Sequence, residues 1–441
     1  MKESNYNFFY QLHNEGDEIV AYNSRTNGLA LMNQNQFKTF NDYTKLGTSI
    51  EDDTFFSDLQ KGGYIVDDSI NELELIQLKL LNARYSSKAL SLTIAPTLDC
   101  NFDCIYCYEK KYRQDAVMSQ EIQDKIVQMV KNNAPYIGEL QITWYGGEPL
   151  LQVEILEDLS RKFIEICKEN KINYSANIVT NGYKLDQEIV KKLKSSNVNS
   201  IQVTLDGPPE IHNVRRPLVG GQPTFDHILK NVKECSDLIN IYLRINIDKE
   251  NEIKINEIID IIENAGLKNK IAFGLGYVEP TNSCYQLDTC MDYEEFSNLE
   301  HNFHNILMER GFIEQKLRRY PNLKGGYCGA EYNNNYVIDP KGNMYKCWTD
   351  IGIEKYVIGN LIDDKIETST KLDTIRNYLL YDPTTDSECR ECSFLPICMG
   401  GCPRKRRDNL VDRCSEYKYT LDKYLKDIAI DKYKNEITDQ L

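Results

Sequence analysis

The stretch CNFDCIYC, residues 100–107, places three cysteines in one short loop directly after an apolar run at residues 91–95. Thiolates spaced this closely can hold three irons of a 4Fe-4S cluster, which leaves the fourth iron without a protein ligand. A structural zinc site would need four closed ligands, and no nearby histidine completes this set. The spacing therefore predicts an iron–sulfur site with one open coordination position, and zinc is the less favoured alternative.

The composition excludes several classes of protein. The chain has 441 residues, with 52 Lys and Arg against 67 Asp and Glu, so its net charge is −15. Nucleic acids and anionic membranes need a basic surface, so we expect neither as a partner. The N-terminus lacks the apolar core of a signal peptide, and no stretch approaches the roughly 18 apolar residues of a membrane span. We therefore expect a cytoplasmic chain whose 14 cysteines are reduced and are read first as metal ligands.

The middle of the chain alternates strand and helix candidates, which predicts an α/β fold with a parallel sheet. The six strand candidates are residues 91–95, 140–145, 175–180, 201–205, 241–247 and 271–277, and amphipathic helical stretches separate them. Six strands are too few for the closed eight-stranded barrel. We therefore expect a partial (β/α)6 barrel that is open on one side.

The flanking regions suggest four further parts. Residues 1–75 read as a small α+β module similar to a winged helix, and residues 76–90 as a helical linker to the barrel at residues 91–285. Residues 286–326 read as a bridging helical segment, and residues 327–441 as a cysteine-rich domain.

The cysteine loop, with Tyr106 before its last cysteine, resembles the signature of radical S-adenosylmethionine (SAM) enzymes. The run at residues 146–149, GGEP, is similar to a second motif of that family, and residues 208–215 resemble the "DG…H…R" run of one of its branches. The resemblance implies that Cys100, Cys104 and Cys107 are catalytic and hold a cluster whose open iron chelates SAM.

Further cofactor contacts follow from the same resemblance. They are assigned to Tyr106, Gly146, Gly147, Glu148, Pro149, Asn181, Thr204, Asp206, Arg215, Arg244 and Asn246. Arg244 and Asn246 match an R-x-N pattern and would face the barrel interior together. The alternative for these two is a buried polar pair that ties a strand to a loop.

The C-terminal cysteines look like the SPASM pattern of radical enzymes that mature peptides and proteins. By resemblance, Cys389, Cys392, Cys398 and Cys414 close one auxiliary cluster, and Cys328, Cys347 and Cys402 serve another. The resemblance thus implies SAM and three 4Fe-4S clusters. Whether Cys284 or Cys290 completes the set of Cys328, Cys347 and Cys402 is left open.

Two departures distinguish this sequence from the anaerobic sulfatase-maturing enzymes of the same architecture. Those enzymes supply a fourth thiolate near the position of Cys328, which is the only cysteine between residues 322 and 335 here. They also carry an Asp that acts as a base, directly after the cysteine that matches Cys347. This chain has Trp348 at that position, and the nearest acid in the sequence is Asp350. Three ligands would leave an iron free for a substrate cysteine.

The resemblance implies a peptide maturase that acts on a ribosomally made, Cys-rich precursor and forms a thioether crosslink. Alternatives are formylglycine formation, carbon–carbon crosslinking, or a non-enzymatic iron–sulfur sensor. The N-terminal module would hold a leader sequence by strand addition. A low-potential donor of the flavodoxin or ferredoxin type is expected, in an anaerobic or low-oxygen cell.

The remaining candidates are interpreted structurally. Cys167 and Cys235 are expected to be small buried hydrophobic residues. His301 and His304 have helical spacing but lack acidic partners, so we expect ordinary helix-surface residues. The basic run at residues 404–407 is expected to be solvated or to compensate local negative charge, with a nucleic-acid patch as the alternative.

Overall fold

The structure is a computed structural model that describes residues 1–13, 16–113, 116–279, 285, 287–313, 319–363, 369–410 and 412–438. The chain divides into two compact units. The terminal unit comprises Met1–Tyr85, Tyr293–Tyr332 and Leu380–Leu441, and the barrel unit comprises Ser86–Asp292 and Asn333–Leu379.

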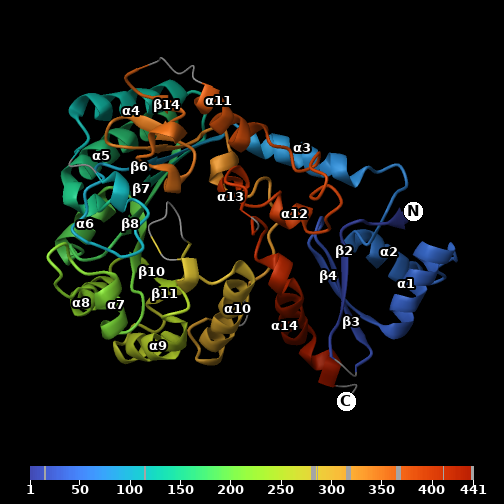
Figure 1. Ribbon diagram of the computed structural model, residues 1–441. Helices are drawn as coiled ribbons and strands as arrows, with labels where there is room; N and C mark the ends of the chain where they lie inside the picture. The colour runs from blue at the N-terminus through green and yellow to red at the C-terminus, as the bar shows by residue number, and fades with distance from the viewer. Residues whose placement is uncertain are drawn as a thin grey trace. The chain divides into compact units, whose positions relative to one another are not determined.

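The barrel unit contains the six predicted strands, which pair in parallel in the chain order of the sequence (Figure 1). They are β6 (Ala89–Ile94), β7 (Glu139–Trp144), β8 (Asn173–Thr180), β9 (Val198–Thr204), β10 (Asn240–Ile247) and β11 (Ile271–Tyr277). Because the carboxyl ends of parallel strands share one edge, the loops after β6 to β10 are brought together there. The predicted α/β class with a parallel-dominated sheet is confirmed.

Amphipathic helices cover this sheet. They are α4 (Gln120–Asn133), α5 (Val153–Asn170), α6 (Gln187–Ser195), α7 (Pro209–Arg215), α8 (Phe225–Cys235) and α9 (Ile255–Asn264). In α9 the buried residues are all isoleucines, at positions 255, 258, 259 and 262, which is the spacing of one helix face. The side chains of Ser119 and Asp186 cap α4 and α6 by accepting backbone N–H groups of the first turn.

Three strands extend the barrel sheet beyond β6, and the sequence did not predict them. They are β12 (Asn335–Ile338), β13 (Asn343–Tyr345) and β14 (Gly359–Asn360), and β12 pairs in parallel with β6. Val337 and Ile338 are fully buried, and Val337 packs with Ala95 and Leu98. Residues 333–379 therefore lie with the barrel, which differs from the predicted boundary at residue 327. The same unit contains α11 (Ser369–Ile375).

The terminal unit begins with an α+β module, as expected. Its antiparallel sheet consists of β2 (Asn7–Gln11), β3 (Glu18–Asn23) and β4 (Gly28–Asn33), and β1 (Lys2–Glu3) pairs with β5 (Ile65–Val66). The helices of the unit are α1 (Gln34–Leu46), α2 (Asp53–Gly62), α3 (Glu72–Arg84), α10 (Tyr293–Glu309), α12 (Leu395–Cys398), α13 (Pro403–Arg407) and α14 (Tyr417–Thr438).

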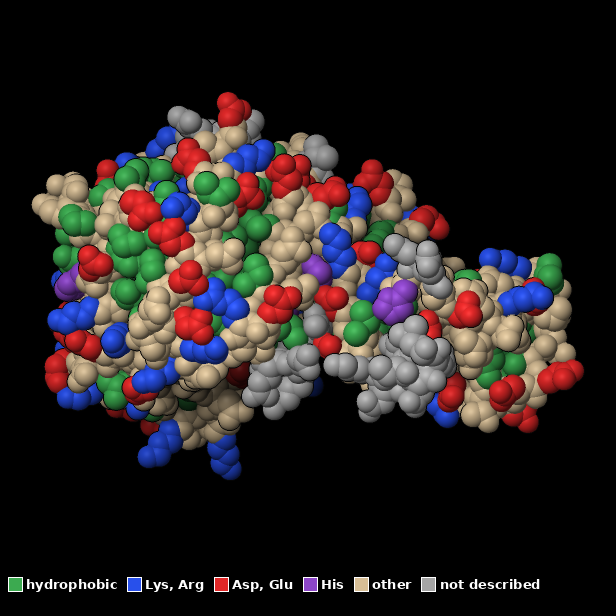
Figure 2. Space-filling view, turned by 90° about the horizontal axis from the view of Figure 1, so that it is seen from below, with side chains coloured by type: hydrophobic (Ala, Val, Ile, Leu, Met, Phe, Trp, Pro, Cys, Tyr) green, Lys and Arg blue, Asp and Glu red, His purple; other side chains and the backbone are tan. Residues whose placement is uncertain are grey.

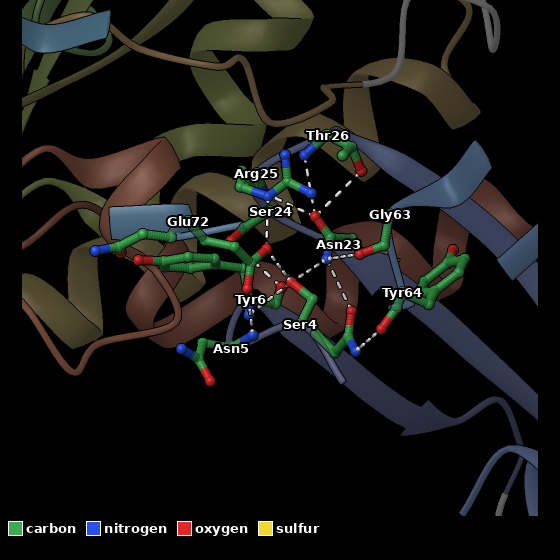
Figure 3. Close-up of polar contacts among 12 residues, drawn as sticks. Ser4, Asn5, Tyr6, Asn23, Ser24, Arg25, Thr26, Gly63, Tyr64 and Glu72 are labelled. Carbon is green, nitrogen blue, oxygen red and sulfur yellow. Dashed lines mark hydrogen bonds and ion pairs between the residues drawn. The ribbon is translucent and has the colours of Figure 1, made fainter. Parts of the chain in front are cut away.

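A buried polar network joins β1, β3 and α3 within this unit (Figure 3). The Glu72 carboxylate accepts hydrogen bonds from Ser4 Oγ at 2.7 Å and from Arg25 Nε at 2.6 Å. Asn23 Nδ2 donates to Ser4 Oγ and to the Gly63 carbonyl, both at 2.9 Å. Because buried polar groups are costly when unpaired, this network specifies how the first residues pack on α3.

The terminal unit shows where the basic run at residues 404–407 and His301 lie. Arg404 and Lys405 are buried, and ion pairs link them to Asp408 and Asp412 at 3.7 and 3.4 Å. The basic run therefore compensates local negative charge. The prediction that His301 lies on the helix surface is wrong, because it is buried and its Nε2 lies 2.9 Å from Asp427 Oδ2.

Three further observations concern the burial of cysteines, the charge on one face and the length of the helices. Cys167 and Cys235 are buried on α5 and α8, as predicted, and Cys290 is buried as well, whereas Cys284 lies outside the described residues. Positive and negative side chains are interspersed on the face shown in Figure 2. Within the described ranges, no helix is long and apolar enough to cross a membrane.

Candidate functional site

The cysteine loop at residues 100–107 follows β6 and is fastened to the chain that follows α7. The backbone N–H groups of Asp103 and Ile105 donate to the carbonyls of Pro217 and Arg215, at 2.9 and 3.0 Å. All three cysteines of the loop line one cavity of about 360 Å³ in the barrel unit. In the part of the chain that the structure describes, no three His, Cys, Asp or Glu side chains converge as ligands of one ion would.

Most of the predicted cofactor residues line this cavity together. They are Tyr106, Gly146, Gly147, Asn181, Thr204, Arg244 and Asn246. The four others are buried but are not among the residues that line the cavity: Glu148, Pro149, Asp206 and Arg215.

Gly146 and Gly147 are required by the approach of the strand end to the cysteine loop. A Cβ atom at Gly147 would lie 2.1 Å from the Asp99 carbonyl oxygen, and one at Gly146 would lie 2.3 Å from the Thr97 carbonyl oxygen. Gly146 also has a φ of +117°, which L side chains rarely adopt. The glycines thus hold the backbone that leads into the cysteine loop, in addition to lining the cavity.

Glu148 supports the neighbouring strand end. Its carboxylate accepts hydrogen bonds from Thr180 Oγ1 and the Asn181 N–H, both at 2.7 Å, and from the Leu150 N–H at 3.0 Å. Burial raises its pKa, although these donors act in the opposite direction. Asn181 in turn donates from Nδ2 to Asn101 Oδ1 at 2.8 Å. Glu148 is therefore a positioning residue for Asn181, which lines the cavity.

Tyr106 is the centre of a polar cluster at the cavity wall. Its hydroxyl donates to the Asp206 carboxylate and accepts from Arg216 Nη1 at 2.7 Å and from Asn246 Nδ2 at 3.0 Å. Arg244 Nε donates to Asn246 Oδ1 at 2.7 Å. The carboxylate of Asp206 thus orients the aromatic residue of the cysteine motif.

The adjacent residues Arg215 and Arg216 have different environments. Arg215, the last residue of α7, is buried, and its Nη1 donates to Asp248 Oδ2 at 2.6 Å. Arg216 leaves the helix with a φ of −136° and lines the cavity. The sequence analysis selected Arg215 as a cofactor contact and did not single out Arg216, and the point where the helix ends decides which of the two lines the cavity.

The cavity has a further wall that the sequence did not indicate as a contact surface. Tyr145, Trp348, Glu109 and Tyr108 line it, and the rings of Tyr145 and Trp348 lie 4.8 Å apart. Trp348 is 39% exposed, although it is a large hydrophobic residue. Burial raises the pKa of the Glu109 carboxyl to about 8. The signal that could have found Tyr145 is its position directly before the GGEP run.

Asp350, the nearest acid to Trp348 in the sequence, is not among the residues that line the cavity. It is 1% exposed, and the Tyr378 hydroxyl donates to its Oδ2 at 2.9 Å. Its carboxylate is therefore part of the packing of the barrel unit.

Cysteines also line a second cavity, which lies in the terminal unit. Cys389, Cys392, Cys398 and Cys414 line a cavity of about 120 Å³, together with Arg413 and Lys418. Burial raises the pKa of the Cys398 thiol to about 12. These four residues are the set that the sequence assigned to one auxiliary cluster.

The other predicted set is divided between the two units. Cys328 and Cys402 belong to the terminal unit and Cys347 to the barrel unit. Cys328 is exposed, whereas Cys347 and Cys402 are half-buried. Their joint role as cluster ligands stays a prediction.

Comparisons with known proteins concern the domain that contains the cysteine loop. The family model of the radical SAM superfamily matches residues 94–269. The cysteine-type anaerobic sulfatase-maturating enzyme of Clostridium perfringens (strain 13 / Type A) is 27% identical over 370 residues, which cover 76% of this chain and 94% of that enzyme.

Two solved structures share the fold. Native anSMEcpe with bound AdoMet and Kp18Cys peptide has a TM-score of 0.59 at 21% identity and covers 80% of this chain and 99% of its own. SuiB of Streptococcus suis bound to the precursor peptide SuiA has a TM-score of 0.53 at 16% identity and covers 93% of this chain and 97% of its own. The chain is thus an enzyme with a radical SAM domain, homologous to the anaerobic sulfatase-maturating enzymes.

Proposed function

We propose that this enzyme forms a thioether in a ribosomally made, Cys-rich precursor peptide. It removes a hydrogen from a substrate carbon and joins that carbon to a cysteine sulfur of the same peptide. Two hydrogens leave the peptide in all, one as a hydrogen atom and one as the thiol proton. The carbon–sulfur bond forms with release of one electron, which iron–sulfur acceptors of the chain would take.

The residues of the barrel cavity fit SAM and a 4Fe-4S cluster. Cys100, Cys104 and Cys107 would hold the cluster, and Gly146 and Gly147 let the strand end pack against the backbone that leads into their loop. Bound together, the cluster and SAM supply a deoxyadenosyl radical that abstracts hydrogen from carbon. Arg216 is a buried cation at the cavity wall, and it suits the carboxylate of SAM.

The chain itself orients these groups. The Asp206 carboxylate and Arg216 hold the Tyr106 hydroxyl, and Glu148 holds the Asn181 loop. Because these supports are buried, the cavity wall is preorganised before any ligand enters.

The observation that carries thioether formation is the wall formed by Trp348. In the resembling sulfatase-maturing enzymes an acid occupies this position and acts as a base. Here the exposed indole of Trp348 lies with its ring 4.8 Å from that of Tyr145 and tilted by 42°, and the acid nearest in the sequence, Asp350, accepts a hydrogen bond from Tyr378. The two rings give this wall an apolar surface beside the Glu109 carboxyl, which lines it too, and such a surface suits an extended peptide that presents an apolar acceptor residue.

The auxiliary clusters are part of the proposal. Cys389, Cys392, Cys398 and Cys414 would hold one, and Cys328, Cys347 and Cys402 would serve the other, for three 4Fe-4S clusters in all. Reduction would come from a flavodoxin- or ferredoxin-type donor.

The N-terminal module would hold the leader of the precursor. Tyr6 and Leu12 pair with Ser24 and Glu18 by backbone hydrogen bonds at both ends of β2, so alternate residues, including Asn7 and Phe9, direct their backbone groups away from β3. In the described chain β2 ends the sheet on that side. An extended peptide can add to such an edge.

The first test needs no substrate. Anaerobically reconstituted enzyme, reduced with dithionite, should release 5′-deoxyadenosine from SAM, and Cys104→Ala should not. Absence of deoxyadenosine from the wild type would favour an iron–sulfur sensor.

The second test separates thioether from formylglycine formation, which the homology to sulfatase-maturating enzymes favours as the alternative. The Kp18Cys peptide and the SuiA peptide serve as probes, together with any short Cys-rich peptide that is found encoded beside the gene. Thioether formation removes two hydrogens, retains the sulfur and blocks alkylation of the cysteine. Loss of the sulfur from Kp18Cys would support formylglycine formation instead.

A further inference from the structure

Polar side chains lie close to the sulfur atom of Cys389. The Tyr381 hydroxyl lies 3.6 Å from Cys389 Sγ and 3.0 Å from Asp386 Oδ2. Arg413 Nη2 lies 4.0 Å from the same sulfur and 3.5 Å from Asp386 Oδ2. Lys418 Nζ lies 3.9 Å from the sulfur of Cys414, which lines the same cavity.

Two neighbours, Arg406 and Gly400, hold Tyr381 in this place. The Arg406 guanidinium lies 3.5 Å from the ring centroid. On Gly400, a Cβ atom would lie 2.8 Å from Tyr381 Cε1, so only glycine leaves room for the ring. The packing of the ring therefore holds the Tyr381 hydroxyl close to the Cys389 sulfur.

Arg406 is itself fixed by a buried ion pair. Its Nη2 lies 3.4 Å from Glu331 Oε1, and Arg84 Nη2 lies 3.3 Å from the same oxygen. The Tyr327 N–H donates to the other oxygen of Glu331 at 2.7 Å. A chain of contacts thus runs from Arg84 on α3 through Glu331, Arg406 and the Tyr381 ring to the sulfur of Cys389.

A thiolate that ligates a cluster only accepts hydrogen bonds. Asp386 is an acceptor too, so the single hydroxyl proton of Tyr381 lies between two acceptors. Hydrogen bonds to cluster sulfurs and nearby positive charge stabilise the reduced cluster, which carries one more negative charge, and so raise its reduction potential.

We propose that Tyr381 is a positioning residue of the auxiliary cluster held by Cys389, Cys392, Cys398 and Cys414, and that its hydroxyl, with Arg413, raises the reduction potential of that cluster. The inference rests on the proposed function, because the cluster is part of it. A raised potential suits this cluster to accepting the electron that carbon–sulfur bond formation releases.

The test is an anaerobic redox titration followed by electron paramagnetic resonance. It uses the full-length chain with Cys100, Cys104 and Cys107 changed to Ala, so that only auxiliary clusters remain. The signal component and the iron that are lost when Cys389 and Cys392 are both changed to Ala identify the cluster in question, because alanine cannot ligate iron. If this double variant loses neither, these cysteines hold no cluster, and both the cluster assignment and this inference are overturned.

Tyr381→Phe should retain iron and shift the midpoint potential of that component to a more negative value. The matched control is Tyr22→Phe, which removes a buried hydroxyl of the same unit that donates to Asn27 Oδ1 at 2.6 Å. An unchanged potential in Tyr381→Phe with full iron overturns the inference and leaves the cluster assignment intact.

A second variant tests the inference if Tyr381→Phe loses the cluster. Difluorotyrosine at position 381 keeps the ring and makes the hydroxyl a stronger donor. It should shift the same component to a more positive value, and no shift would overturn the inference.

Discussion

Arg216 Nη1 donates a hydrogen bond of 2.7 Å to the hydroxyl of Tyr106. Arg215, one residue earlier, is paired with Asp248 at 2.6 Å. We expect Arg216→Gln to weaken SAM binding by about 10- to 100-fold, because a charged hydrogen bond contributes about 1.5–3 kcal/mol. Calorimetric titration of the reconstituted enzyme with SAM measures this.

The comparison variant is Arg215→Gln, which leaves Asp248 buried without its ion-pair partner. It should lower the free energy of unfolding by about 3–5 kcal/mol, as measured by chemical denaturation. Equal losses of SAM affinity in two equally stable variants would contradict this division of roles.

Gly147→Ala should prevent correct packing of the cysteine loop. The new Cβ would lie 2.1 Å from the Asp99 carbonyl oxygen, and the backbone cannot give way as a side chain can. We expect a loss of stability of about 1–3 kcal/mol and less iron bound after reconstitution. Gly138→Ala is the control, since its nearest neighbour would lie 3.9 Å away, and it should match the wild type.

Trp348→Ala should uncouple cofactor cleavage from product formation. The indole is part of the cavity wall but is not one of the cysteines or of the residues around Tyr106. We therefore expect SAM affinity near that of the wild type and a several-fold rise in deoxyadenosine formed per crosslink, because a loosely held substrate is misaligned. Liquid chromatography of deoxyadenosine and modified peptide gives the ratio, and an unchanged ratio would remove Trp348 from the substrate wall.

Glu72→Ala should destabilise the N-terminal module. The change leaves Arg25 without the carboxylate at 2.6 Å and Ser4 without its acceptor. A loss of about 3–5 kcal/mol is expected for a buried pair broken on one side. Hydrogen exchange of residues 1–75 reports it locally. Glu74→Ala, on the exposed side of the same helix, should leave exchange unchanged.

Acid should weaken the barrel unit through His212. Its Nδ1 accepts the Asp206 N–H at 3.1 Å, and burial, aided by Arg216 and Arg215, holds its pKa well below the usual value. The folded chain therefore stays unprotonated where the unfolded chain binds a proton, below pH of about 6.5. Stability should be fully present above that pH and fall below it, by up to about 1.4 kcal/mol per pH unit. Denaturation at several pH values should show a shallower acid slope in His212→Gln.

The sequence predicted the parts of the fold that depend on local patterns. All six barrel strands follow from alternation, and the set of four cysteines around one cavity follows from the resemblance to the SPASM pattern. Two features did not follow. The choice between Arg215 and Arg216 depends on where α7 ends, and the place of β12 depends on a pairing with β6 across about 240 residues of chain. Neither leaves a periodic signal near the residues concerned.

The pairing of β12 with β6 has a consequence for dissection of the molecule. A fragment that stops after β11 would lack residues 335–338 and leave the backbone of Ser91 to Ile94 without the partner that it has here. Exposed strand edges promote association between copies. Such a truncated barrel should aggregate on expression, so the minimal soluble piece must extend through residue 360.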